Sequence, residues 1–408
     1  MCLHCASNQE LKSALATTSH SESQPQYQWS GMSQPPRAAT NPQKRKATKM
    51  YTFPFDSDEV PQHERLGGKC TSLAIMTKAG APVPPGFAVT TDAFDAVMKQ
   101  TNLLNDIKNL IAGLNHEDVA AVDKVSAQIR ELILNQPVPE AVHEAAYQAY
   151  DALMELCGGE VPVAVRSSAT AEDLPDASFA GQQDTYLWIT GRSNVMHKIR
   201  ECWASLYTSR AMTYRLANNI SDDGLSMAVA VQKMVNSRTS GVAMTIDPSN
   251  GDRSKIVVDA SWGLGEMVVS GEVTPDNFVI DKVMLHPVKR IISDKHEELV
   301  PDGKGGIMRH EIEADRRNAP CLNDEELIAV ARLAKSAEKH YGCVQDIEWA
   351  IDADLPEGRN VLLLQSRPET VWSQKPVEVK VTSMGSGIEA ITNSLMAQMS
   401  DRLGTSGK

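Results

Sequence analysis

The sequence predicts an α+β protein, because helical periodicity and strand patterns both recur along it. Apolar residues at helical spacing mark 119–134, 139–156 and 324–341. A further helix is expected at 195–207 and a connection at 314–322, after which Asn323 caps the helix at 324–341. An uninterrupted apolar run at 161–165 and the clear alternation at 344–351 instead predict strands. With 408 residues, the chain is long enough for two or three domains or subdomains and for a sizeable core.

Composition and charge are those of an ordinary soluble globular protein. Hydrophobic residues make up 42% and charged residues 23%, and the formal net charge of −12 argues against a surface for nucleic acid. No apolar run approaches the roughly 20 residues that a membrane helix needs. Seven scattered cysteines suit a reducing compartment better than a disulfide framework. We therefore expect a cytoplasmic protein with no nucleic-acid partner and no membrane partner.

Residues 1–49 are predicted to form a disordered leader. They are rich in Ser, Gln, Thr and Pro, and they lack both hydrophobic periodicity and the apolar core of a secretory signal. The spacing of Cys2 and Cys5 is typical of metal ligands, but no second pair lies nearby, so no zinc site is expected. A targeting role and a true translation start at Met50 are the open alternatives for this segment.

Two glycines near the start of the structured region predict close approach of the backbone to an anion. Gly67 and Gly68 precede Lys69, and Thr71 or Ser72 is expected to cap a short helix. The positive N-terminus of that helix, together with Lys69, would then face the anion. A surface turn is the alternative interpretation.

The stretch 163–187 places one arginine and several hydroxyl groups directly after a predicted buried strand. Arg166 is followed by Ser168 and Thr170, and the stretch contains the flexible pair Ala180-Gly181. Arginine offers a planar fork of donors, and hydroxyl and backbone N–H groups can surround further oxygens, which suits a polyphosphate. A polar surface loop after a core strand is the alternative.

The strand expected at 226–235 ends in a segment with possible nucleotide contacts. Backbone groups around Gln232, Met234 and Val235 are placed to bind an adenine ring, although a plain buried strand has the same pattern. Farther on, Glu266 follows two glycines and is a candidate contact to nucleotide or metal. A solvated glutamate beside turn-forming glycines is the alternative for that residue.

A hairpin between two strands, 344–351 and 361–368, is expected to carry polar side chains on one face. Those side chains are Asp346, Glu348, Gln365 and Arg367. Carboxylate and amide oxygens are the hard ligands that Mg²⁺ prefers, and arginine binds phosphate oxygens. The pattern therefore predicts a Mg²⁺–triphosphate platform, with an exposed hairpin face bearing a Glu–Arg pair as the alternative.

Taken together, these motifs resemble the nucleotide-binding domain of the phosphoenolpyruvate synthase and pyruvate phosphate dikinase family over about residues 66–372. The resemblance implies an ATP-grasp fold, with two subdomains and the nucleotide between them. It places these subdomains at 50–225 and 226–373, followed by a linker or tail at 374–408. It also implies ATP and Mg²⁺ as cofactors, and no P-loop motif is present to suggest another nucleotide-binding fold.

The resemblance further implies roles for individual residues. Lys69, Arg166 and Arg367 would be catalytic, because they would neutralise charge on the transferring phosphoryl groups. Glu348 and Gln365 would hold Mg²⁺. The residues implied in ATP binding are Lys69, Arg166, Ser168, Thr170, Gln232, Met234, Val235, Glu266 and Asp346.

Full-length members of the family move the β,γ-pyrophosphoryl group of ATP to a histidine on a swivelling domain, release AMP, and then phosphorylate a small acceptor. Only 36 residues follow Trp372, and none of the ten histidines has the Thr-Ser-His-Ala setting of the phosphorylated histidine. We therefore expect a stand-alone ATP-binding subunit, as in phenylphosphate synthase, that is active with a separate histidine protein. The final acceptor would be pyruvate or a phenol-like compound.

Three other interpretations remain open. A split or truncated phosphoenolpyruvate synthase fits the same motifs. An ADP-forming ATP-grasp ligase or kinase would share the fold but would not need the Gln365 and Arg367 pair. A non-catalytic ATP-binding regulatory module would not need the whole set of charged residues.

Overall fold

The computed structural model describes residues 50–100, 103–170, 173–174, 177–178, 184–222 and 224–372. The expected leader, the expected tail and the pair Ala180-Gly181 lie outside these residues. The described residues belong to one unit, Lys49–Lys408. They form the α+β fold that the sequence predicts, and all strand pairings found among them are antiparallel.

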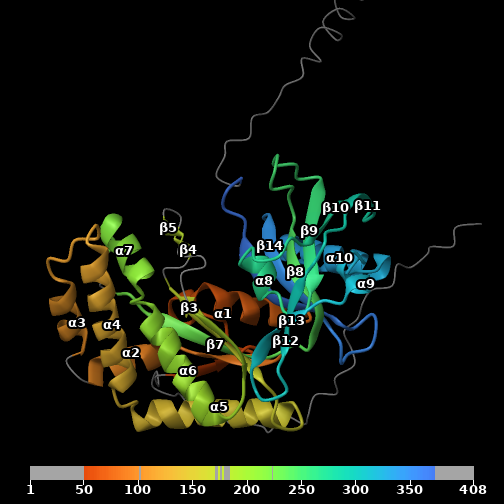
Figure 1. Ribbon diagram of the computed structural model, residues 1–408. Coiled ribbons are helices and arrows are strands. Elements are labelled where there is room, and N and C mark those ends of the chain that lie inside the picture. The colour runs from red at the N-terminus through yellow and green to blue at the C-terminus, as the bar shows by residue number, and fades with distance from the viewer. Residues whose placement is uncertain are drawn as a thin grey trace, which may run out of the picture. The chain divides into compact units, whose positions relative to one another are not determined.

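The elements follow one another along the chain as shown in Figure 1. Up to residue 233 they are β1 Thr52–Pro54, α1 His63–Lys78, β2 Gly86–Val89, α2 Thr91–Gln100, α3 Leu103–Ile111, α4 Val119–Asn135, α5 Glu140–Leu156, β3 Val163–Ala169, β4 Asp173–Leu174, β5 Ala177–Ser178, β6 Thr185–Ile189, α6 Arg192–Ser205, α7 Ser209–Ala217 and β7 Met227–Lys233. From residue 237 they are β8 Ser237–Met244, β9 Lys255–Trp262, α8 Glu266–Val269, β10 Asp276–Asp281, β11 Pro287–Ile291, β12 Glu297–Pro301, β13 Ile307–Glu311, α9 Ala314–Arg317, α10 Asp324–Tyr341, β14 Gln345–Asp352 and β15 Val361–Pro368.

The first sheet has the strand order β1-β2-β7-β3-β6 and is covered on both faces. Helices α2 to α7 pack on one face, and α1 packs on the other (Figure 1). The sequence of β7 explains this arrangement: Val229 and Val231 point into the thick helical layer, whereas the smaller Ala228 and Ala230 point toward α1. Small side chains on that face allow α1 to approach the sheet closely.

The second sheet has the order β11-β10-β9-β8-β14-β15, and helix α10 covers one of its faces. The hydrophobic side of α10 packs against Ile347, Trp349 and Ile351 of β14, as the alternation predicts. The intervening Asp346 and Glu348 therefore point to the other face. The hairpin is confirmed, because β14 pairs with β15 in a register that joins Asp346 to Arg367 and Glu348 to Gln365.

Local signals account for both boundaries of α10. Asn323 begins α10 as the expected N-terminal cap and forms a capping box with Glu326, and Gly342 ends the helix in the left-handed conformation. The helix expected near 195–207 is α6, in which Trp203 is buried.

Three expectations need correction. Thr71 and Ser72 do not cap a helix, because both lie inside α1, which begins before the two glycines. The segment expected to be a connection at 314–322 contains the short helix α9. The subdomain boundary expected at 225/226 falls before β7, which pairs in the first sheet, so the change of sheet comes between β7 and β8.

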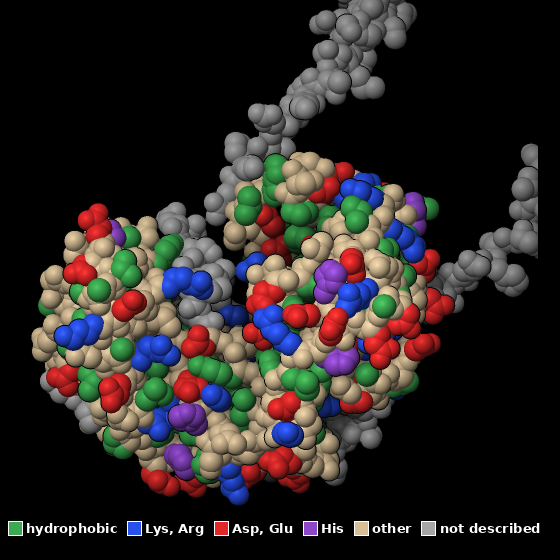
Figure 2. Space-filling view, viewed as in Figure 1, with side chains coloured by type: hydrophobic (Ala, Val, Ile, Leu, Met, Phe, Trp, Pro, Cys, Tyr) green, Lys and Arg blue, Asp and Glu red, His purple; other side chains and the backbone are tan. Residues whose placement is uncertain are grey.

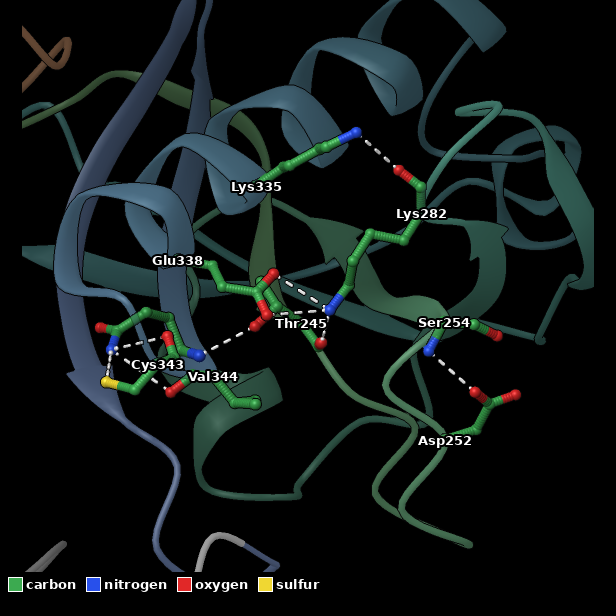
Figure 3. A network of polar contacts seen from close by, with 9 residues as sticks. Thr245, Asp252, Ser254, Lys282, Lys335, Glu338, Cys343 and Val344 are labelled. Atoms are coloured by element: carbon green, nitrogen blue, oxygen red, sulfur yellow. Dashed lines mark hydrogen bonds and ion pairs between the residues drawn. The ribbon is translucent and has the colours of Figure 1, made fainter.

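A polar network holds the turn after β10 against the end of α10 (Figure 3). The Lys282 ammonium group pairs with the Glu338 carboxylate at 3.0 Å and also contacts the carbonyl oxygen of Thr245. The backbone of Lys282 is bonded on both sides, because its N–H donates to Ser254 O at 2.9 Å and its carbonyl accepts from Lys335 Nζ at 2.8 Å. These contacts fix one end of the second sheet on its covering helix.

The surface has a mixed charge. On the face shown in Figure 2, acidic and basic side chains are interspersed with apolar ones. Among the helices of the described residues, none has both the length and the apolar character needed to cross a membrane.

Candidate functional site

Arg166 joins the two sheets. It lies on β3, and the alternation of that strand turns Ala164, Arg166 and Ser168 to the face that carries α1. From there Nη2 of Arg166 donates to Glu348 Oε2 at 2.6 Å and to Gln365 Oε1 at 2.8 Å. Nη1 donates to the carbonyl oxygen of Leu364 at 3.0 Å, and 12% of the arginine side chain is exposed. Three predicted site residues from distant parts of the chain therefore meet at one guanidinium group.

Asp346 and Arg367 lie two residue pairs farther along the hairpin, on the same face as Glu348 and Gln365. Arg367 Nε lies 3.6 Å from Asp346 Oδ2, and half of the Arg367 side chain is exposed. The other oxygen of the carboxylate, Asp346 Oδ1, is shielded from solvent and has no hydrogen-bond partner among the described residues. Such a buried acceptor is costly to leave unpaired, so it marks a place where a ligand would be favoured.

Burial raises the pKa of the Asp346 carboxyl above its usual range, although Arg367 acts in the opposite direction. A carboxyl with a raised pKa binds its proton more tightly in the folded protein, so its ionisation lowers stability as the pH rises through that pKa. Asp346→Asn cannot ionise. We therefore expect it to raise the free energy of unfolding at neutral pH, with the gain shrinking as the pH falls toward the ordinary pKa of aspartate.

Urea denaturation of the nucleotide-free protein at neutral and acidic pH measures this difference. Asp324→Asn is the matched control, because its hydrogen bond from Arg290 lowers the pKa of Asp324. It should change stability in the opposite direction, with a loss at neutral pH that disappears in acid. Equal losses for both variants would contradict the assignment of Asp346 as a destabilising buried charge.

The backbone next to Lys69 is held against β3. Ser168 is completely buried, and its Oγ accepts a hydrogen bond from the N–H of Cys70 at 3.1 Å. Lys69 is thus attached next to the strand that carries Arg166. Thr170, which follows β3, donates to the carbonyl oxygen of Ser226 at 3.2 Å, so its hydroxyl is bonded within the first sheet.

The end of β7 lies beside an apolar cluster. Met234 is 9% exposed and packs with Ala164, Leu264, Met267 and Leu299. These residues come from separate elements, and a single apolar residue on each carries no sequence signal, so Met267 and Leu299 were not predicted. An apolar surface of this kind is what a flat aromatic base requires.

The two remaining residues of the predicted adenine segment are also buried. Gln232 is 2% exposed, and its Nε2 donates to the carbonyl oxygen of Pro84 at 3.2 Å. Val235 is 3% exposed. Any contact from these two residues to a base would therefore come from the backbone.

Glu266 stands apart from the arginine group. It begins the short helix α8 and is exposed, and the charged groups that act on it are Glu272 and Arg309. Within the described ranges, no hydrogen bond or ion pair joins Glu266 to Arg166, Glu348 or Gln365.

The oxygens of Glu348 and Gln365 suit a hard cation. Both accept from the same nitrogen of Arg166, so a positively charged group already lies between them. Carboxylate and amide oxygens are the ligand types that Mg²⁺ takes. No group of three or more His, Cys, Asp or Glu side chains in the part of the chain that the structure describes is arranged to hold a metal. A metal at Glu348 and Gln365 would accordingly need further oxygens, such as those of a phosphate.

Comparison with known protein families gives one match, over residues 63–386, to the pyruvate phosphate dikinase AMP/ATP-binding domain. The chain belongs to this family. The match covers the resemblance expected over residues 66–372 and includes the hairpin, Arg166 and Lys69.

Proteins with similar sequences include three phosphoenolpyruvate synthases or probable phosphoenolpyruvate synthases. A probable phosphoenolpyruvate synthase of Staphylothermus marinus is 44% identical over 79% of this chain and 42% of its own length. The phosphoenolpyruvate synthase of Aeropyrum pernix is 43% identical over 77% and 42%. That of Pyrococcus furiosus is 37% identical over 76% and 42%. The chain therefore spans less than half the length of these relatives.

Proposed function

We propose that the chain is the ATP-binding part of a dikinase-type phosphotransferase. In this proposal it has an ATP-grasp fold whose two subdomains are the parts built on the first and the second sheet, with the nucleotide between them. It transfers the β,γ-pyrophosphoryl group of ATP to a histidine on a separate swivelling-domain protein and releases AMP. The histidine protein then phosphorylates a small acceptor, such as pyruvate or a phenol-like compound.

The observation that carries the proposal is the meeting of Arg166 with Glu348 and Gln365. A guanidinium group, a carboxylate and an amide from two sheets converge within hydrogen-bond distance. Asp346 and Arg367 continue the same surface. Such a set is expected where a triphosphate and its cation are bound together. The cation would bind the carboxylate and amide oxygens, and the arginines would bind the phosphate groups.

Positioning and charge neutralisation would be the main contributions of this chain to the reaction. Arg166 and Arg367 would bind oxygens of the transferring phosphoryl groups, and Lys69 would approach them from α1. Glu348 and Gln365 would hold Mg²⁺, which supplies charge neutralisation at the phosphates when bound. Met234 and the apolar cluster around it would face the adenine ring.

The proposed setting follows from the same features. Within the described part of the chain, no cysteine is joined to another in a disulfide, which supports a reducing compartment such as the cytoplasm. The cysteines concerned are Cys70, Cys157, Cys202, Cys321 and Cys343. The separate histidine partner is proposed on the basis of the family, in which a histidine on a swivelling domain accepts the pyrophosphoryl group.

The nucleotide product tests the proposed function. The protein is incubated with Mg²⁺ and ATP labelled at the β-phosphate, with and without a swivelling-histidine protein, and AMP is separated from ADP. AMP that forms only with the partner, together with label on that partner, is the expected result. ADP formed without a partner would contradict the proposal and indicate an ordinary ATP-grasp ligase or kinase.

Replacing Arg367 with alanine is expected to lower AMP formation about 10²-fold or more, because a cation facing the developing phosphoryl charge is lost. Half of the side chain is exposed, so the fold should be retained. Arg290→Ala is the matched control, since Arg290 is a similarly exposed arginine of the same sheet that pairs with Asp324. If both variants kept wild-type AMP formation, Arg367 would not belong to the phosphate face.

A further inference from the structure

Helix α1 is broken two residues before Lys69. Gly67 has φ 66° and ψ 176°, which is outside the helical region and open essentially to glycine alone. The backbone is pressed against β3 at this point, because a Cβ atom on Gly67 would lie 2.2 Å from the carbonyl oxygen of Ser168. The kink therefore sets the direction in which the rest of α1 leaves the first sheet.

The hydroxyl group of Ser168 is hydrogen-bonded to the backbone on both sides of this kink. Ser168 Oγ donates to the carbonyl oxygen of Leu66 at 2.8 Å and accepts from the N–H of Cys70 at 3.1 Å. A serine hydroxyl has a single hydrogen, and here it is given to Leu66. Phosphate oxygens at neutral pH are acceptors, so Ser168 cannot donate to one without giving up its bond to the kink. The hydroxyl group of Ser168 therefore supports the backbone of α1, which is a different role from the phosphate contact that the sequence suggested.

A second hydroxyl ties the same helix to the second sheet. Ser72 Oγ donates to the carbonyl oxygen of Ser366 at 2.7 Å and is 3.0 Å from the hydroxyl oxygen of Tyr341. Ser366 lies between Gln365 and Arg367, two residues of the phosphate face. Ser72 follows Lys69 by three residues and so lies on the same side of the helix. The part of α1 that carries Lys69 is therefore hydrogen-bonded both to β3, through Ser168, and to β15, through Ser72.

We propose that Ser168 and Ser72 are positioning residues that hold the kinked helix α1 between the two sheets and thereby place Lys69 against the phosphates of the nucleotide. The proposal rests on the proposed role of Lys69 in phosphate binding. A displacement of about 1 Å in a charged group can cost as much as about 100-fold in rate. A helix attached on both sides limits such displacements more than a lysine on a free helix would.

The test compares the affinities for ATP and for adenosine, measured by isothermal titration calorimetry with Ser168→Ala and Ser72→Ala. Both variants should weaken ATP binding on the order of tenfold, because a charged contact is misaligned, and leave adenosine binding unchanged. Ser126→Ala is the control, since Ser126 is a buried serine whose Oγ donates to the carbonyl oxygen of Tyr207 at 2.7 Å, away from α1. It should leave both affinities unchanged.

Double-mutant cycles with Lys69→Ala separate positioning from direct contact. If the serines act through Lys69, adding Ser168→Ala or Ser72→Ala to Lys69→Ala causes no further loss of ATP affinity. An equal loss in both backgrounds would show that the serine itself contacts the nucleotide and would overturn the proposal. Parallel losses for ATP, adenosine and the Ser126→Ala control would overturn it as well, because they indicate general destabilisation.

Failure of this proposal and failure of the proposed function give different results. Full ATP affinity in Lys69→Ala would contradict the role of Lys69 in the proposed function, and the positioning role with it. Weak ATP binding in Lys69→Ala, with wild-type binding in both serine variants, would overturn the positioning role alone. Should Ser168→Ala fail to fold, Ser72→Ala still decides the question, because Ser72 is only partly buried.

Discussion

Replacing Arg166 with alanine is expected to lower kcat/KM for ATP about 10²- to 10³-fold, the loss typical of removing one donor that faces developing charge. The expected effect is large because Arg166 contacts both proposed metal ligands and lies where the phosphates would be bound. Its guanidinium group is largely shielded from solvent, and electrostatic interactions are stronger in such surroundings than at the surface. AMP formation with the histidine partner measures the loss.

Although Arg166→Ala should lower activity, it should increase the affinity for metal ions when nucleotide is absent. In the structure, Nη2 of Arg166 lies within hydrogen-bond distance of both Glu348 and Gln365, so a free cation must compete with it. Arg166→Ala removes this competitor. We expect Mn²⁺ to bind the nucleotide-free variant more tightly than the nucleotide-free wild type, as measured by electron paramagnetic resonance of the free ion.

Arg215→Ala is the control for both measurements. Arg215 is a buried arginine that pairs with Asp222 at 2.6 Å in the helical layer of the first sheet. Its removal should reduce stability but leave Mn²⁺ binding unchanged. Weaker Mn²⁺ binding in Arg166→Ala than in wild type would mean that the arginine supports a metal site instead of competing for it.

Gly67→Ala is expected to destabilise the protein by about 3–5 kcal/mol, since a side chain there combines a glycine-only backbone conformation with overpacking against β3. The nearest atoms to an added Cβ are the backbone oxygen of Ser168 at 2.2 Å and its carbonyl carbon at 2.7 Å, and backbone cannot move aside cheaply. The free energy of unfolding from urea titration measures the loss, and ATP affinity should fall with it.

Gly80→Ala provides the comparison within the same part of the chain. Gly80 follows the end of α1 and also has a positive φ of 81°, but no atom lies within 4 Å of an added Cβ. Only the backbone cost of about 1–2 kcal/mol then remains. Equal losses at the two positions would contradict the close approach of the kink to β3.

Elements with local signals were predictable from the sequence. The alternation from Ile347 to Ile351 identifies the buried face of β14. Because side chains alternate along a strand, Asp346 and Glu348 must lie on the opposite face. Helix α10 was predictable because Asn323 begins it with a capping box. In both cases the physical cause lies within a few residues of the element.

Contacts between the sheets were not predictable in the same way. Arg166 is separated from Glu348 and Gln365 by 182 and 199 residues, and no local pattern specifies which partner an arginine will find. Polar composition indicated phosphate chemistry for Ser168, whereas its hydroxyl is bonded to backbone about one hundred residues earlier. The kink at Gly67 was missed because two glycines suggest the start of a helix as readily as a break within one.

The attachment of α1 to both sheets also affects the order in which the chain can fold during synthesis. Ser72 and Ser366 are separated by 294 residues, so a ribosome needs on the order of tens of seconds between making the helix and making its second support. Leu73 packs on the first sheet, whereas Met76 of α1 belongs to the apolar core of the second sheet and lacks those partners until then. The first helix of the described chain thus receives its second attachment from the last described strand, so its final position is set only when nearly all of the described chain has been made.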